Sequence, residues 1–146
     1  MIVEVVAVGT ELLLGQILNS NATWIGGRLA EEGWDANHQQ VVGDNRARLA
    51  EAIRVAMSRA DAVVITGGIG PTQDDLTREA IAEATGRPLL FNDAYAERLG
   101  AWWFKRTGKE MPVSNFRQAE YPEGAIQYDN PKGTAPGLGL DHEGTW

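Results

Sequence analysis

The chain has 146 residues and no cysteine, and its 13 basic and 20 acidic side chains give a formal net charge of −7. This length suits one domain with a sizeable core, and the lack of cysteine excludes disulfides, thiolate metal sites and a cysteine nucleophile. No run of Lys or Arg is present and no apolar stretch approaches the roughly 18 residues of a membrane span, so we expect neither a nucleic-acid nor a membrane partner.

The first predicted element is a strand over residues 2–8, which is β-branched and nearly continuous in apolar character. It has no basic flank and no small-residue cleavage site, so we interpret it as a strand and not as a signal peptide, and we expect a cytoplasmic protein. Residues 19–21 supply N-cap candidates for a helix that runs to about residue 32, where Gly33 follows as a C′ residue.

The rest of the chain continues to alternate strands and helices. In chain order the predicted segments are a strand over 34–42, a helix capped by Asp44 or Asn45, an apolar strand over 62–65, helices from 75 or 77 to 85 and from 92 to about 107, a short helix over 112–120, and short strands over 125–128 and 137–140. This alternation predicts a parallel sheet with helices on both faces. Such sheets bind ligands outside the carboxyl ends of their strands.

The motif Thr66-Gly-Gly-Ile-Gly-Pro-Thr-Gln-Asp-Asp75 joins the third strand to a helix start. Its glycines can adopt backbone conformations closed to other residues, so their N–H groups can turn toward one anion. The amino terminus of the next helix adds partial positive charge, and two threonines offer hydroxyl donors. The motif therefore predicts a phosphate site. The expected ligand-binding residues in it are Thr66, Gly67, Gly68, Gly70 and Thr72.

Asp74 and Asp75 need a different explanation, because carboxylates repel a phosphate. A divalent cation such as Mg²⁺ between them and the phosphate would resolve this, since Mg²⁺ usually binds through one or two carboxylates. The alternative is that one Asp is a helix cap and that the glycines only shape a turn. The motif is not a P-loop, because the Gly-Lys-Ser/Thr ending is missing, and its glycine spacing differs from the dinucleotide fingerprint.

A second motif, Gly9-Thr-Glu-Leu-Leu-Leu-Gly15, directly follows the first strand. It places Thr10 and Glu11 at the carboxyl end of that strand, where a site is expected. Asn21 belongs to an amide-rich stretch a few residues later. The alternatives are a solvated loop position for Glu11 and a helix cap for one of the amide residues.

The third motif is Asn130-Pro-Lys-Gly-Thr-Ala-Pro-Gly137, in which Lys132 and Thr134 could contact a phosphate. A hairpin turn explains its Pro and Gly residues equally well. Trp102 packs on the core in the simplest interpretation, although an exposed Trp could also make a subunit contact or stack on an adenine. We also expect the domain to form a homo-oligomer.

Together, the three motifs resemble the molybdopterin-binding (MoaB/MogA-like) family, and their combination resembles its CinA-like branch. The resemblance spans essentially the whole chain and implies one domain over residues 1–146, a three-layer α/β/α sandwich with a mostly parallel sheet. Members of this family continue beyond such a loop into further strands and a Leu-Pro-Gly-Pro-Pro type motif. We therefore expect this domain to be truncated at its C-terminal end.

The resemblance also implies a function, because several domains of this branch act as metal-dependent ADP-ribose pyrophosphatases. The leading hypothesis is hydrolysis of a nucleotide diphosphate such as ADP-ribose to AMP and ribose 5-phosphate. Glu11, Asp74 and Asp75 would be catalytic and would hold a divalent metal such as Mg²⁺ that activates water. The alternatives are a module that binds molybdopterin or its adenylated form without turnover, and a domain that mainly supports a partner or an oligomer.

Overall fold

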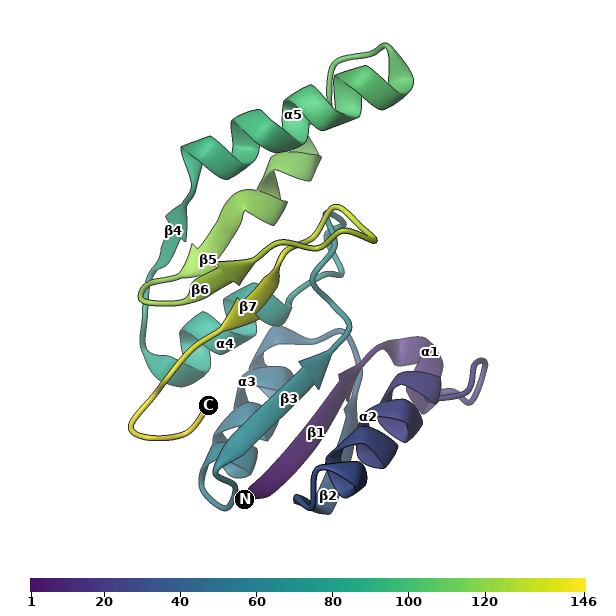
Figure 1. The fold of residues 1–146 in the computed structure, drawn as a ribbon, viewed down its shortest axis with the longest axis vertical. Coiled ribbons are helices and arrows are strands. Elements are labelled where there is room, and N and C mark those ends of the chain that lie inside the picture. Colours follow the sequence, from purple (N-terminus) through teal and green to yellow (C-terminus); the bar gives the residue numbers. More distant parts are fainter.

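A parallel three-stranded sheet forms the base of the fold in the computed structural model, which describes residues 1–146 (Figure 1). β1 (Ile2–Val8) lies in the middle, between β2 (Asp35–Val42) and β3 (Ala62–Thr66). Val8 lies opposite Val42, and Ala7 lies opposite Thr66. The three strands therefore end together at one edge of the sheet, as the sequence predicts.

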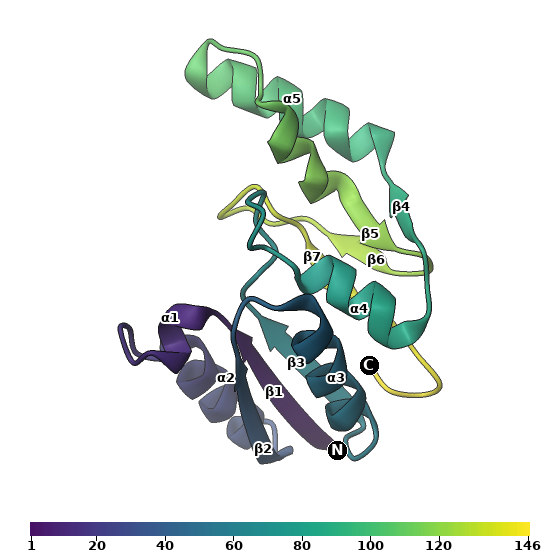
Figure 2. The same ribbon diagram turned by 180° about the vertical axis from the view of Figure 1, so that it is seen from behind.

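Helices cover both faces of this sheet, and α2 lies in front of it in Figure 1 while α3 lies in front in Figure 2, the view from behind. Val3 and Val5 of β1 pack against α2, whereas Val6 and Val8 point to the other face and pack against α3. This alternation confirms the predicted three layers. The helices are α1 (Thr10–Leu13), α2 (Ser20–Glu31), α3 (Arg46–Met57), α4 (Thr77–Thr85) and α5 (Asp93–Thr107).

Asparagine caps begin three of these helices. The side chains of Asn19, Asn45 and Asn92 each accept a hydrogen bond from a backbone N–H three residues later, at 2.9–3.2 Å. Gly86 and Gly108 end α4 and α5 in the left-handed conformation. Of the two candidates for the α3 cap, Asn45 is therefore the one that caps the helix.

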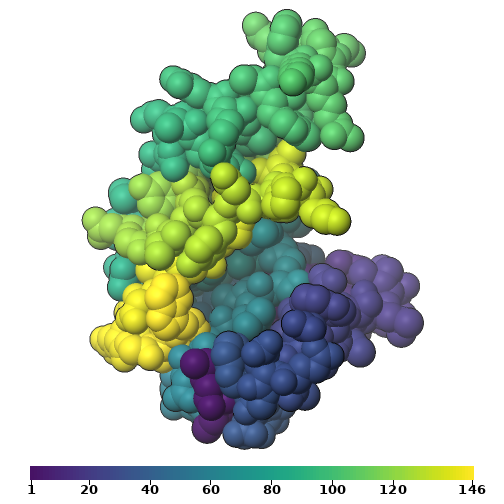
Figure 3. Space-filling model, viewed as in Figure 1, coloured from purple at the N-terminus to yellow at the C-terminus, as the bar shows by residue number.

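The second part of the chain is built from two short antiparallel sheets and α5. β4 (Leu89–Phe91) pairs with β5 (Glu120–Pro122), and β6 (Ile126–Tyr128) pairs with β7 (Gly137–Gly139). A 3-10 helix, η1 (Val113–Ala119), follows α5 and confirms the short helix expected there. In Figure 3 the green residues near 90–120 form a lobe that stands away from the purple and blue part. The short strands β4 and β5 were not predicted.

β3 is an edge strand, and the chain returns to its outer side at Trp146. The N–H of Trp146 donates to Asp61 O, and the N–H of Val63 donates to Trp146 O. These two bonds place Trp146 beside the outer edge of β3. None of the helices combines the length and the apolar character needed to cross a bilayer.

Candidate functional site

The glycine turn, residues 66–75, lies against the carboxyl end of β1. Gly67 and Gly68 have φ angles of 99° and 64°, in the region that other residues rarely adopt. A Cβ atom at Gly67 would overlap the carbonyl oxygen of Val8, and one at Gly68 would overlap the hydroxyl of Thr77. Only glycine therefore fits at these two positions.

Within the glycine turn, the carbonyl groups of residues 67–70 are directed toward the start of α4. Thr77 donates through its hydroxyl to Gly67 O (2.8 Å) and through its N–H to Gly68 O (2.9 Å). The guanidinium of Arg78 donates to the next two carbonyls, those of residues 69 and 70. Four consecutive carbonyl oxygens are thus occupied. The N–H groups of residues 67–69 donate no hydrogen bond inside the protein.

Arg78 lies beneath this turn and is only 1% exposed. It makes no ion pair, and its Nε has no hydrogen-bond partner. Burial lowers the pKa of the Arg78 guanidinium from its ordinary value, and neighbouring charges of both signs act on it in addition. A buried cation normally lies beside a carboxylate. Here the balancing negative charge within ion-pair distance is missing.

Arg117 of η1 holds the other end of the glycine turn. Its guanidinium donates to Thr72 O at 2.5 Å and pairs with the carboxylate of Glu79. Neither arginine was predicted as part of the site from the sequence. Arg78 had a weak signal, as a charged residue in the core-facing first turn of α4. Arg117 had none, because more than forty residues separate it from the turn that it contacts.

Asp75 closes the glycine turn on itself. Its Oδ2 accepts from the N–H and the hydroxyl of Thr72, at 2.8 and 2.6 Å. Burial raises the pKa of the Asp75 carboxyl, but the hydrogen bonds from Thr72 and Gly70 and the charge of Arg78 together outweigh it, so the net pKa lies below its ordinary value. Asp74, next to it, is exposed and makes no hydrogen bond or ion pair. The helix-cap alternative fails for both, since α4 begins after Leu76 without a side-chain cap.

The structure does not bring Glu11, Asp74 and Asp75 together, and no group of three acidic, His or Cys side chains could hold a metal ion. The Glu11 carboxylate lies over Gly9, where its Oε1 would be 2.6 Å from an added Cβ atom. Asp75 points into its own turn, and Asp74 faces solvent. The three residues therefore do not fit the metal site expected from the sequence.

Two other predicted residues do meet at the sheet edge beside the glycine turn. Asn21, at the start of α2, donates through Nδ2 to the hydroxyl of Thr66 at 3.0 Å. Thr10 and Asp44 bond to each other twice. The N–H of Thr10 donates to the Asp44 carboxylate, and the N–H of Asp44 donates to the Thr10 hydroxyl oxygen, both at 3.1 Å. Thr10 thus joins the ends of β1 and β2, while Asn21 and Thr66 flank the turn.

Lys132 and Thr134 lie in a different place. The Thr134 hydroxyl donates to Gln118 Oε1 and its carbonyl accepts from the Tyr95 hydroxyl, both at 2.7 Å. Both residues line a cavity of about 780 Å³ against α5, and no residue of the glycine turn lines that cavity. The β6–β7 hairpin folds its loop toward α5. Tertiary packing decides this direction, and the loop sequence alone does not specify it.

Comparison with known proteins identifies the family of this domain. Residues 4–145 match the family model described as "probable molybdopterin binding domain". The chain belongs to this family. The molybdopterin-binding domain family thus accounts for nearly every residue of the chain and for the α/β fold with its parallel sheet.

The relatives of this family member include competence-damage inducible proteins. That of Symbiobacterium thermophilum is 51% identical over 144 residues, which are 99% of this chain and 34% of the relative. The chain therefore spans about a third of the length of that relative. The solved structure of CinA, a protein with unknown function from Thermoplasma acidophilum, is 35% identical with a TM-score of 0.87, over 98% of this chain and 83% of that one.

A more distant solved structure shows the same fold alone. The molybdopterin biosynthesis enzyme MoaB from Thermus thermophilus superposes with a TM-score of 0.55 at 21% identity, over 77% of this chain and 68% of that one. The site geometry above therefore rests on the side chains of this chain, and the comparisons supply its family.

Proposed function

We propose that the glycine turn binds the phosphate group of a small molecule, either a molybdopterin-type pterin or a nucleotide. The observation that carries this proposal is Arg78, a buried cation without an ion-pair partner directly beneath the turn. A bound anion would supply the negative charge that the protein does not. Membership of the molybdopterin-binding domain family supports the same ligand class.

The backbone of the turn supplies the donors for such an anion. The N–H groups of residues 67–69 are free, and Gly67 is exposed. No side chain caps the amino terminus of α4, which adds partial positive charge nearby. Asn21 and Thr66, joined by their hydrogen bond, provide amide and hydroxyl groups at the edge of the turn. Together these groups form an anion site built mostly from main-chain donors.

We propose hydrolysis of a nucleotide diphosphate, such as ADP-ribose, as a second candidate function. Asp74 favours it, because this carboxylate is exposed at the turn and engaged with no protein group. Mg²⁺ commonly enters a site together with substrate phosphates and one or two carboxylates. In the reaction a water oxygen bonds to one phosphorus while the bridging P–O bond breaks, which gives AMP and ribose 5-phosphate.

Homo-oligomer formation and a cytoplasmic location stay predictions.

Calorimetric titration with ADP-ribose and with molybdopterin, each with and without Mg²⁺, tests both functions when AMP release is measured in parallel. Gly67→Ala should weaken ligand binding by about tenfold or more, because the new Cβ displaces the turn. Gly27→Ala is the matched control, since Gly27 lies in α2 with nothing within 4 Å of its Cβ position and no positive φ. This control should bind as the unmodified protein does.

Asp74→Asn separates binding from turnover. Under the hydrolase proposal this variant binds ADP-ribose but loses Mg²⁺-dependent AMP release. Ligand binding without any AMP release from the unmodified protein would overturn the hydrolase and keep the binding site. Unchanged affinity in Gly67→Ala, or no binding of either ligand, would overturn the phosphate site itself.

A further inference from the structure

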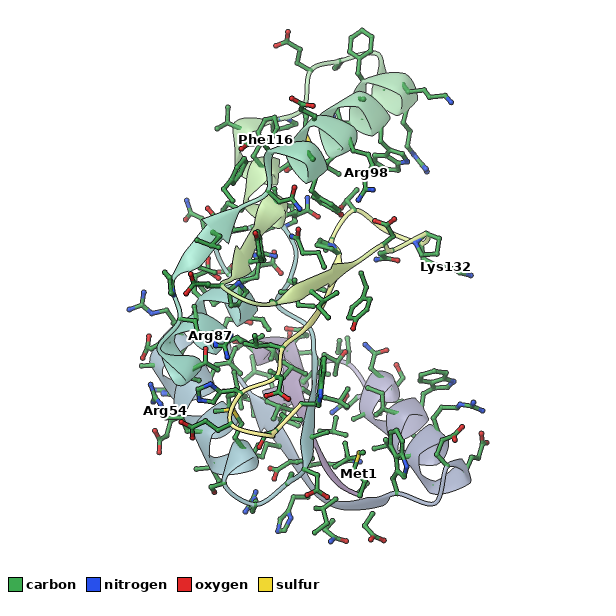
Figure 4. All side chains as sticks on the ribbon, turned by 60° about the vertical axis from the view of Figure 1, so that its left-hand side comes forward. Met1, Arg54, Arg87, Arg98, Phe116 and Lys132 are labelled. Atoms are coloured by element: carbon green, nitrogen blue, oxygen red, sulfur yellow. The ribbon has the colours of Figure 1, made fainter.

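Arg117 reaches the glycine turn from a part of the chain that has its own apolar core. This part comprises residues 89–122, that is β4, α5, η1 and β5, and we call it the α5 lobe. Phe116 of η1 packs there against a cluster that includes Leu99 of α5, and neither residue belongs to the two clusters around β1. Figure 4 shows Phe116 beside α5, whereas Arg87 lies lower, near α4. The contacts of Arg117 therefore join two separately packed regions.

The guanidinium of Arg117 spans three acceptors at once. Besides its bonds to Thr72 O and to Glu79, it reaches the carbonyl of Asp75 at 3.5 Å. Thr72 is thereby held from two sides, since its N–H and hydroxyl donate to Asp75 while its carbonyl accepts from Arg117. A guanidinium carries its donors in a rigid, planar fork, so it fixes the relative positions of the groups that it binds. Arg117 thus places the Glu79 carboxylate as well as the turn.

Glu79 follows Arg78 directly in α4 and yet does not pair with it. Its Oε1 accepts from Arg117, while its Oε2 and the Nε of Arg78 are both buried without a hydrogen-bond partner. The Glu79 side chain is only 18% exposed, so water and salt screen its charge weakly. Burial lowers the pKa of the Arg78 guanidinium, and the Glu79 carboxylate exerts the largest opposing effect. Glu79 is therefore the carboxylate best placed to neutralise Arg78, and Arg117 engages it instead.

We propose that Arg117 is a positioning residue, which by engaging Glu79 keeps the positive charge of Arg78 available to an anion in the glycine turn. This inference rests on the proposed function, because it requires a phosphate group at the turn. If the α5 lobe moves away, Arg117 leaves with it, and the uncompensated charge of Glu79 then opposes the anion. The α5 lobe in this way controls the affinity of the glycine turn, although its own contacts there are to carbonyl groups and a carboxylate.

The test is an NMR titration with inorganic phosphate, followed at the backbone N–H signals of residues 67–69 in the unmodified chain and its variants. Arg117→Met should weaken phosphate binding about tenfold, because the Glu79 charge is left uncompensated near Arg78. Adding Glu79→Gln to this variant removes that charge and should return the affinity to within about twofold of the unmodified chain. Loss of a residue that only supported the fold would not be rescued in this way.

Glu79→Gln alone gives a second measurement, which does not depend on how the Arg117 variant folds. It retains Arg117 and loses one negative charge near Arg78, so its phosphate affinity should rise about threefold. Arg87→Met is the matched control, because Arg87 also donates to two carbonyls, those of residues 123 and 141, but to none in the glycine turn. This control should bind phosphate as the unmodified chain does.

The outcomes separate this inference from the proposed function. If phosphate shifts no signal of residues 67–69 in the unmodified chain, the phosphate site is overturned and this inference with it. If phosphate binds but Arg117→Met keeps its affinity, or if adding Glu79→Gln restores none of the loss, only the inference is overturned. A fall in phosphate affinity in Glu79→Gln alone, or an equal loss in Arg87→Met, would also overturn it.

Discussion

The parallel and the antiparallel parts of this chain are held together in different ways. The parallel part buries residues 3–8 of its central strand on both faces, with Val5 and Val6 at 0% exposure. The antiparallel part consists of three-residue strands that are mostly half-buried or exposed, and α5 leaves Phe104 and Trp102 at the surface. Burial of apolar side chains therefore stabilises the parallel part, whereas side-chain hydrogen bonds contribute more to the stability of the antiparallel part.

The glycine turn lies where these two parts meet. Arg78 holds it from the parallel part, and Arg117 of η1 reaches it from the other. Arg87 makes a similar connection farther away, because its guanidinium donates to Glu123 O and Asp141 O. The site thus depends on both parts, but through side chains of different burial. Substitutions of these side chains can test that difference.

The largest effect is expected at Arg78. Arg78→Met should lower the free energy of unfolding by about 3 kcal/mol, because two partly buried carbonyls lose their donors. Urea denaturation followed by circular dichroism measures it. Arg28→Met on exposed α2 is the control and should change little. A loss at Arg78 no larger than at Arg28 would contradict the view that the turn is anchored in the buried part.

A smaller effect is expected at Glu4, a carboxylate in β1 that is 1% exposed. Arg59 contacts it through two 2.8 Å hydrogen bonds, and these bonds, with a third from Gln40, lower the pKa of Glu4 below its ordinary value despite burial. The resulting stability is present above the ordinary pKa of Glu and is lost as the pH falls through the lowered pKa.

Glu4→Gln should therefore lower the free energy of unfolding by about 2 kcal/mol at pH 7 and by less in acid. Urea denaturation at a series of pH values from 7 to 3 measures the difference between the two proteins. A gap that stays constant across this range would show that the Glu4 charge is not the cause.

The smallest effect, and the most local, is expected at Arg87. Arg87→Met removes the tethers to residues 123 and 141, and about fivefold faster amide hydrogen exchange should follow in β6 and β7. Exchange in β1 and β3 should stay the same, because apolar burial supports those strands. Equally faster amide exchange in β1 and β3 would contradict the view that the parallel and antiparallel parts are stabilised in different ways.

The sequence predicted those elements whose local signals are strong. β1 is a continuous run of apolar residues broken only by Glu4, and Asn19, Asn45 and Asn92 stand where helix caps belong. β4 and β5 escaped prediction because three residues show no periodicity and their pairing joins segments about thirty residues apart. Their existence depends on tertiary contacts.

The residues of the site also divide into those with a strong local sequence signal and those that only the folded structure reveals. Gly67 and Gly68 were predicted, since their unusual backbone follows from the strand-to-helix join. The two adjacent aspartates differ in a way that the sequence does not show, because Asp75 accepts hydrogen bonds from Thr72 within the turn whereas Asp74 is exposed. Arg78 could not be assigned its place, because only the folded turn shows which carbonyls it meets.

The glycine turn would bind an anion mostly through main-chain amides, which do not distinguish the group to which the phosphate is attached. Substitution cannot retune it without breaking its shape, since a Cβ at Gly67 or Gly68 has no room. Selectivity among related ligands would then evolve in the elements around it. The same phosphate-binding turn would in this way serve family members that bind chemically different ligands.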